Sequence, residues 1–168
     1  ILEGSNNNTG NDNGGSTLGG DNQGIVLQYR TGDTNTKDNA IRPEFNIKNT
    51  GNTAVKLSDL KIRYYYTDES KGQQLFVDWA KVGNEKVKAT FVALPEPKAK
   101  ADKYVEISFT DGTIQPGGES GEIQPRIHAA NWSNFDETND YSYGASQTFA
   151  NWDHATVYQQ GKLVWGIE

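Results

Sequence analysis

Short runs of alternating apolar and polar residues, separated by turn residues, fill the chain from residue 24 onward and constrain its fold most strongly. Period-two alternation is typical of a strand with one buried face, whereas an amphipathic helix needs a period near 3.6 residues. No segment combines a long helical period with helix caps. The runs that we interpret as strands cover residues 25–30, 44–50, 59–67, 73–82, 87–94, 103–110, 121–128 and 155–166.

These runs predict an all-β fold, an antiparallel nine-stranded β-sandwich with jelly-roll topology. The segments between them are rich in Gly, Asn, Asp and Pro, residues with specific backbone preferences in turns. The last run contains a hairpin that turns at Gln160-Gly161. Only 34% of the residues are hydrophobic, but 8 Tyr, 6 Phe and 4 Trp supply apolar area that suits a half-buried sheet.

Residues 1–23 consist almost entirely of Asn, Gly, Ser, Thr and Asp after the first three. Such a segment buries too little apolar area to offset its ordering entropy, so it predicts a flexible Asn/Gly-rich linker. An alternative for its first five residues is a remnant of cloning. Residues 24–168 then form one domain with one core, which we interpret as a module of a larger protein.

Charge and composition exclude several classes of protein. The chain has 22 acidic and 16 basic residues and a net charge of -6, which argues against nucleic acid, because phosphates require clustered Lys and Arg. It has no cysteine, so neither disulfides nor thiolate metal sites are expected. No run of about 18 apolar residues is present, and we expect no membrane partner.

Residues able to hold a metal or perform catalysis are few. The histidines His128 and His154 are isolated in the sequence, which argues against zinc. Asp136, Asn139 and Asp140 share one loop, and residues 67–69 follow a strand with further oxygens; calcium uses such ligands, and a solvated acidic loop is the alternative. No nucleophile elbow or phosphate loop is present. No carboxylate stands in an apolar sequence setting that would raise its pKa for general-acid catalysis.

The four tryptophans divide into two pairs. Trp152 and Trp165 have apolar neighbours and are predicted to lie in the core. Trp79 and Trp132 have polar neighbours, so each is either half-buried packing or an exposed platform. Arg126 precedes Trp132 by six residues in a stretch that does not resemble a core helix, which favours a surface that contacts a flat polar ligand.

Ordered motifs over residues 25–168 are similar to those of family 3 carbohydrate-binding modules, the cellulose-binding type found beside bacterial cellulases and on scaffolding proteins. The residues that carry the resemblance are FNIKNTG at 45–51, IRYYYT at 62–67, YVEISF at 104–109, QPR at 124–126, NWSN at 131–134, NDYS at 139–142 and LVWG at 163–166. Such a family implies a jelly-roll sandwich that carries a structural calcium ion and a planar strip lying on crystalline cellulose.

The resemblance assigns a role to individual residues of the strip. Asp78 and Arg126 match an acid and a base that pair in plane, and Trp132 and Trp79 match positions of the strip that carry rings. Asn39 and Gln124 match polar groups that anchor neighbouring cellulose chains. The loop at residues 83–86 is shorter than in many cellulose binders and lacks their exposed tyrosine, which implies a strip shorter by one ring.

The resemblance also implies a calcium site. Thr67, Asn139 and Asp140 match its ligands directly. Glu69 and Asp136 stand where an Asp and a Thr are common, and both replacements keep an oxygen. The ion would have a structural role, tying the loop of Trp132 to the end of the strand at 64–66.

The function implied is non-catalytic binding of crystalline cellulose by a secreted, extracellular module that targets an attached glycoside hydrolase to insoluble polysaccharide. A monomer without its own enzyme activity is expected. The alternative is a helper module that packs on an adjacent catalytic domain and extends its substrate cleft.

Overall fold

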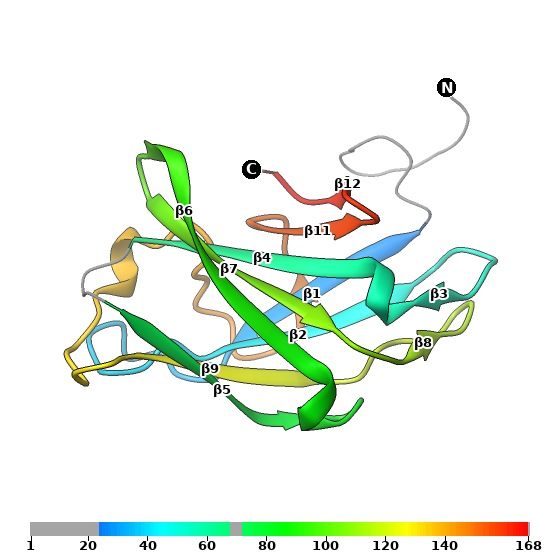
Figure 1. The fold of residues 1–168 in the computed structure, drawn as a ribbon, viewed down its shortest axis with the longest axis horizontal. Helices are drawn as coiled ribbons and strands as arrows, with labels where there is room; N and C mark the ends of the chain where they lie inside the picture. Colours follow the sequence, from blue (N-terminus) through cyan, green and yellow to red (C-terminus); the bar gives the residue numbers. More distant parts are fainter. Residues whose placement is uncertain (1–23, 68–71, 168) are drawn as a thin grey trace.

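The computed structural model describes residues 24–67 and 72–167 as two antiparallel sheets packed face to face, as Figure 1 shows. The linker expected at residues 1–23 lies outside the described residues. The chain crosses repeatedly between the sheets, placing β1 and β2 in one, β4 in the other and β5 in the first again. This confirms the predicted all-β sandwich. None of the described elements is a helix long and apolar enough to cross a membrane.

The sheet that carries the candidate site, called the binding sheet below, has five strands. In spatial order they are β10 (Ala150–Asn151), β1 (Ile25–Thr31), β2 (Pro43–Asn49), β9 (Ile123–Ala129) and β5 (Gln73–Ala80). The opposite sheet consists, in spatial order, of β12 (Lys162–Trp165), β11 (Ala155–Gln159), β4 (Leu60–Tyr66), β7 (Ala101–Phe109) and β6 (Val87–Lys98). The smaller elements are the pair β3 (Val55–Lys56) and β8 (Thr113–Ile114) and the 3-10 turns η1 (Leu57–Asp59), η2 (Asn84–Lys86) and η3 (Glu137–Asn139).

All of the predicted strands are present, and three two-residue strands, β3, β8 and β10, were not predicted. The other difference concerns β6, which we expected to end at residue 94 because Pro95 and Pro97 follow. Instead it continues to Lys98, which pairs with Ala101 after an irregular register. A proline lacks the N–H that an interior ladder needs, but β6 is an edge strand of the opposite sheet, where this loss is tolerated.

The core between the sheets is aromatic. Tyr29, Phe45 and Tyr64 are fully buried, and the Tyr29 ring lies 6.0 Å from that of Phe45 and 6.2 Å from that of Tyr64. Trp152 stacks on Tyr29 at 5.6 Å, and its indole N–H donates to Ser142 O. Trp152 and Trp165, which were predicted to lie in the core, are partly buried and pack against it. Such packing gives the outer sheet faces a rigid support.

The hairpin at the end of the chain turns at the predicted dipeptide. Gln159 pairs with Lys162, and Gln160 and Gly161 between them have φ values of 51° and 83°. Two consecutive positive φ values define the turn type whose twist matches that of a two-residue β-hairpin.

Candidate binding face

A β-bulge in β5, an edge strand of the binding sheet, determines which of its residues face outward. Val77 pairs with Pro125 but Trp79 pairs with Gln124, so β5 has one extra residue, Asp78, at this point. Alternation alone would place residues 76 and 79 on opposite faces, and the extra residue reverses this. Phe76, Asp78 and Trp79 are therefore all exposed, with Phe76 at 48% and Trp79 at 46%.

Asp78 holds the guanidinium of Arg126 across the strand pair. Arg126 Nε donates to both carboxylate oxygens at 3.1 and 3.2 Å, and Nη2 donates to Asp78 Oδ1 at 3.1 Å. Several donors from one planar group fix its orientation as well as its position. The guanidinium carbon also lies 5.5 Å from the ring centroid of Phe76. The predicted pairing of Asp78 and Arg126 is present on the outer face.

Trp132 covers the end of β9. Its indole stacks on His128 with 3.8 Å between ring centroids and 11° between planes, and its exposed fraction is 55%. His128 in turn stacks on Phe76 at 5.2 Å and 14°. His128 belongs to the outward-facing set of β9, yet it is 1% exposed because these two rings cover it. One face of the indole rests on the imidazole, which leaves the other open.

These groups form a row along β9 and β5, in which His128 lies beneath two rings. The row is called the edge row below and is made of Trp132, His128, Phe76, Arg126, Asp78 and Trp79. Its cross-strand partners are His128 with Gln74, Arg126 with Phe76, and Gln124 with Trp79. Four residues of strand cover about 13 Å. Two adjacent strands and the turn after β9 therefore supply the row.

Of the two predicted polar groups, the structure places Gln124 on this face. Gln124 lies opposite Trp79 and donates from Nε2 to Glu122 Oε1 at 2.9 Å. Asn39 is exposed in the loop that approaches the end of β9, where Ile41 bridges Ile127. Asp78, Trp79, Arg126, Trp132 and Gln124 thus share one region of the binding sheet, and Asn39 lies in the loop before Ile41.

Phe76 and His128 are members of the edge row that the sequence did not indicate. Phe76 stands in Leu75-Phe76-Val77, which reads as a uniform apolar run. His128 was interpreted as an isolated histidine, and the other histidine, His154, lies elsewhere, stacked on Tyr141 at 4.5 Å. Strict alternation along β9 from Gln124 would have indicated that His128 faces outward, but not that two rings cover it.

Four of the five proposed calcium ligands belong to the described residues, namely Thr67, Asp136, Asn139 and Asp140. Thr67 N donates to Asp140 Oδ1 at 2.9 Å, and Thr67 Oγ1 donates to Asn139 O at 3.0 Å. Asp136 Oδ1 accepts from Thr138 N at 3.0 Å as the cap of η3. Glu69 lies outside the described residues. Among those that are described, no three His, Cys, Asp or Glu side chains form a metal-binding group.

The side-chain amide of Asn139 lies beside two other oxygens of the proposed calcium site. In one orientation its oxygen faces two other oxygens, Asp136 O and Asp140 Oδ1, whereas after rotation its nitrogen donates to them at 2.6 and 3.3 Å. Three oxygens that converge in this way suit a hard cation, and without a cation the rotated amide is favoured. The residues present therefore fit calcium.

Glu137, between these residues, corrects the expectation that no carboxylate stands in a setting that would raise its pKa. It is 2% exposed, and its Oε1 has no hydrogen-bond partner within the described part of the chain. Burial, followed by the charges of Asp140, Asp38 and Asp33, raises the pKa of Glu137 to about 9. A raised pKa is typical of catalytic acids, but a side chain this deeply covered cannot reach a substrate.

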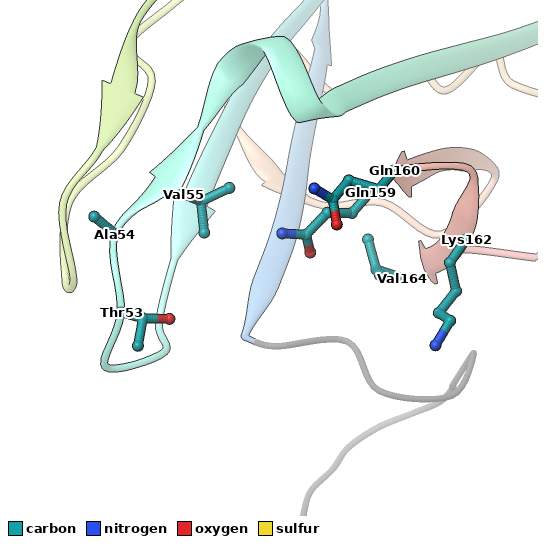
Figure 2. Close-up of a pocket in the computed structure, with 7 residues that line it drawn as sticks. All are labelled: Thr53, Ala54, Val55, Gln159, Gln160, Lys162 and Val164. Atoms are coloured by element: carbon teal, nitrogen blue, oxygen red, sulfur yellow. The ribbon is translucent and has the colours of Figure 1, made fainter.

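A shallow pocket of about 290 Å³ lies away from the edge row, beside β3 and the β11–β12 hairpin (Figure 2). Its lining residues are Thr53, Ala54, Val55, Gln159, Gln160, Lys162 and Val164. This lining contains no carboxylate or histidine that could act as a general base beside Thr53 or Lys162.

Exposed rings and a fixed guanidinium on a rigid sheet present their contacts on an open surface, whereas an enzyme encloses its substrate. The fold and the edge row thus define a β-sandwich binding module.

Comparisons with known proteins agree with this class. The family model described as "Cellulose binding domain" matches residues 26–166. Endoglucanase 5 of Pectobacterium carotovorum subsp. carotovorum is 53% identical over 148 residues, covering 86% of this chain but only 29% of that enzyme. A carbohydrate-binding module of Ruminiclostridium thermocellum matches with a TM-score of 0.83 and 42% identity, over 86% of this chain and 99% of that one. The CBM3b module of scaffoldin subunit ScaA from Acetivibrio cellulolyticus matches with a TM-score of 0.84 and 35% identity, over 89% and 99%.

The chain therefore belongs to the family 3 carbohydrate-binding modules, which are non-catalytic and are homologous to modules of cellulases and scaffoldins.

Proposed function

We propose that this chain binds crystalline cellulose through the edge row and targets an attached glycoside hydrolase to insoluble polysaccharide outside the cell. The observation that carries the proposal is the exposure of Trp79 and Trp132 on the same sheet region as the fixed Asp78–Arg126 pair. The names of relatives, an endoglucanase and a scaffoldin subunit, support the attached hydrolase and the extracellular setting.

The chemistry of the edge row suits a glucan chain. A glucose ring has C–H bonds on its faces and hydroxyls at its rim, so a matching protein surface is flat and apolar with polar groups beside it. Indole and phenyl faces are negative and attract such C–H bonds. The guanidinium of Arg126 is planar as well, and its carboxylate partner keeps it from turning away from the row.

The test is a binding isotherm on microcrystalline cellulose for the parent and for Asp78→Asn. The parent should adsorb, and the variant should bind about threefold to tenfold more weakly, because an amide holds the guanidinium less firmly than a carboxylate. Its stability should change by less than about 1 kcal/mol, because the Asp78 side chain is 47% exposed.

Glu106→Gln is the matched control, because Glu106 accepts from Arg63 at 2.9 Å on the opposite sheet. It should adsorb like the parent. A parent that stays in the supernatant, or adsorption unchanged in Asp78→Asn, would count against the proposal.

We also propose a structural calcium ion held by oxygens of Thr67, Asp136, Asn139 and Asp140, with Glu69 from outside the described residues. The convergent oxygens around the Asn139 amide support this assignment. When bound, the ion would neutralise the acidic loop and join it to the end of β4. Two hydrogen bonds from Thr67 already join these segments, so the ion would reinforce a contact that forms without it.

Removing calcium is expected to lower the midpoint of thermal unfolding. At a free concentration about 100 times its dissociation constant, a ligand stabilises by about 2.7 kcal/mol, which corresponds to roughly 5–10 °C for a domain of this size. Scanning calorimetry with chelator and then with excess Ca²⁺ measures the difference. Asn139→Ala should abolish that difference, whereas the exposed Asn131→Ala should retain it. Equal midpoints with chelator and with calcium would contradict the assignment.

A further inference from the structure

Trp132 is the member of the edge row that does not belong to a strand. Trp79 is part of β5 and pairs with Gln124, whereas β9 ends at Ala129 and Trp132 stands three residues further on, in a turn. With 55% of its surface exposed, the indole could rotate about its side-chain bonds, and ordering a mobile side chain on binding lowers affinity. An exposed ring that serves as a contact therefore needs a support of its own.

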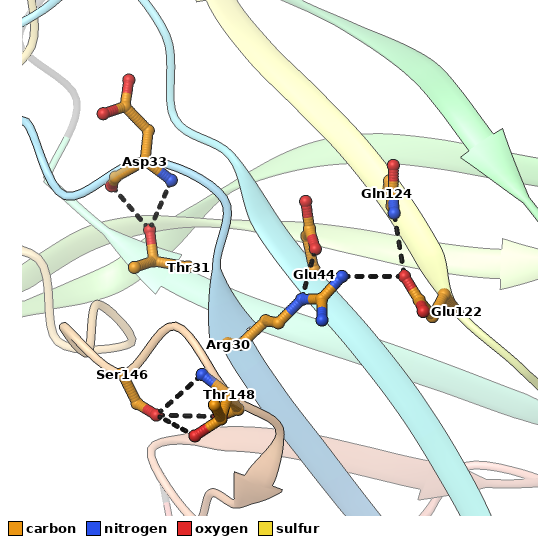
Figure 3. Close-up of polar contacts among 8 residues, drawn as sticks. All are labelled: Arg30, Thr31, Asp33, Glu44, Glu122, Gln124, Ser146 and Thr148. Carbon is orange, nitrogen blue, oxygen red and sulfur yellow. Dashed lines mark hydrogen bonds and ion pairs between the residues drawn. The ribbon is translucent and has the colours of Figure 1, made fainter.

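Hydrogen bonds supply such a support to polar side chains of the binding sheet. Figure 3 shows Arg30 between Glu44 and Glu122, to which its guanidinium donates at 2.6 and 2.9 Å. In the same view Gln124 donates to Glu122 at 2.9 Å. The faces of an indole carry no donor or acceptor of this kind. A flat ring is instead held by stacking on another flat ring.

The ring that supports Trp132 is the imidazole of His128. Their centroids lie 3.8 Å apart and their planes differ by 11°. Trp132 N donates to Ala129 O at 2.9 Å, and His128 Nδ1 lies 3.2 Å from the same oxygen. A carbonyl oxygen only accepts and has two lone pairs, so we assign the proton to Nδ1, which donates. One carbonyl thus joins the turn that carries Trp132 to the imidazole under the indole.

His128 is also fixed from its other side. Phe76 of β5 stacks on the imidazole at 5.2 Å and 14°. Phe76 is the register partner of Arg126, so a neighbouring strand, and not the turn, carries this second ring. Because His128 is only 1% exposed, the close packing around it leaves the imidazole little room to tilt. A ring in a turn therefore rests on a ring that is set firmly in the sheet.

The choice of an imidazole at this position lowers stability. His128 Nε2 is buried and has no hydrogen-bond partner within residues 24–67 and 72–167. A phenyl ring would stack without leaving a polar atom unpaired, but it could not donate to Ala129 O. Departures of this kind from the best core packing are expected at functional sites. Two rings cover His128, so it can influence a ligand only through its neighbours.

We propose that His128 is a positioning residue, which fixes the plane of Trp132 on the edge row before the ligand arrives. This inference rests on the proposed function and adds a residue that acts on the ligand without touching it. The indole is ordered when the domain folds, so binding does not have to supply that ordering.

The experiment compares the parent with two variants on microcrystalline cellulose. His128→Leu keeps a similar volume but has no flat face, and it should adsorb about threefold to tenfold more weakly, because one exposed side chain must then be ordered on binding. His128→Phe keeps a flat ring and should adsorb within about twofold of the parent. In a Trp132→Ala background, His128→Leu should change adsorption by less than about twofold, because a residue that acts through the indole has no effect without it.

Fluorine NMR of protein labelled with fluorotryptophan observes the indole directly and requires no cellulose. The Trp132 resonance is identified by its loss in Trp132→Phe. In the parent it should be displaced from that of the free amino acid by the stacked imidazole. It should move toward the free amino acid in His128→Leu and stay displaced in His128→Phe.

His154→Leu is the matched control, because His154 stacks on Tyr141 at 4.5 Å and 5°, away from the edge row. It should adsorb like the parent and leave the Trp132 resonance in place, and unfolding curves of all variants verify folding. Parental adsorption of His128→Leu, equal losses in His128→Leu and His128→Phe, or an undiminished loss in the Trp132→Ala background would overturn this inference alone. A parent that stays in the supernatant would overturn the proposed function, whereas the NMR comparison would still decide whether His128 positions Trp132.

Discussion

Replacing Trp132 with alanine is expected to weaken adsorption to microcrystalline cellulose at least about 30-fold, the effect of losing a central aromatic contact of about 2 kcal/mol. The indole is the most exposed large ring of the edge row at 55%, and its free face has no other protein contact to make. Its removal also uncovers His128, whose imidazole has a smaller ring and greater polarity. Binding isotherms at constant ionic strength measure the change.

The same substitution should change the free energy of unfolding by about 1 kcal/mol or less, because only one face of the ring is packed. Trp132 has a φ of 62°, a strained conformation that persists where the surroundings require it, and alanine would have to adopt it as well. Trp132→Phe keeps a ring over His128 and should recover most of the adsorption. Adsorption of Trp132→Ala at the parental level would remove Trp132 from the site.

Much of the fold follows from local sequence. Alternation located every strand of four residues or more, because a buried face selects apolar residues at every second position. The Gln160-Gly161 turn was equally local, since few dipeptides accept two positive φ values. The end of β6 could not be predicted from local sequence. Pro95 and Pro97 are tolerated in a strand only at a sheet edge, and the position of β6 at an edge depends on the order of all strands.

The edge row was only partly predictable for a similar reason. Resemblance to a family matched Asp78, Trp79, Arg126 and Trp132 to positions of a strip, and the structure brings these residues together. The bulge at Asp78 depends on how β5 pairs with β9, so alternation along β5 alone does not indicate that Phe76 and Trp79 face the same way. Stacking of His128 under Trp132 depends on a turn in which Trp132 N donates to Ala129 O at 2.9 Å.

Burial of Glu137 is a tertiary effect of the same kind. The residue lies in the polar sequence Asp136–Asp140, which predicts a solvated loop. A second loop covers it, because Glu137 N donates to Thr36 O and Phe135 N donates to Asp38 O, both at 2.8 Å. This loop brings Asp33 and Asp38 close, whose charges add to burial in raising the pKa of Glu137 to about 9.

Replacing Glu137 with glutamine is expected to remove a large pH dependence of stability. The folded protein keeps Glu137 protonated up to a pKa of about 9, whereas in the unfolded chain this carboxyl ionises at its ordinary value of 4.5. Unfolding therefore releases a proton in this range, and stability falls by up to about 1.4 kcal/mol for each pH unit above the unfolded value. The contribution is complete below that value and is lost as pH rises through the folded pKa.

Denaturant unfolding between pH 5 and pH 8 in the presence of a chelator measures this effect without a contribution from calcium. Glu137→Gln should match the parent near pH 5 and exceed it by about 2–4 kcal/mol at pH 8, because the amide is neutral in both states and needs no proton. The exposed Glu96→Gln should follow the parent at every pH. Parallel curves for Glu137→Gln and the parent would mean that Glu137 is already ionised in the folded domain, so that a charged carboxylate is tolerated beside Asp140 even without a cation.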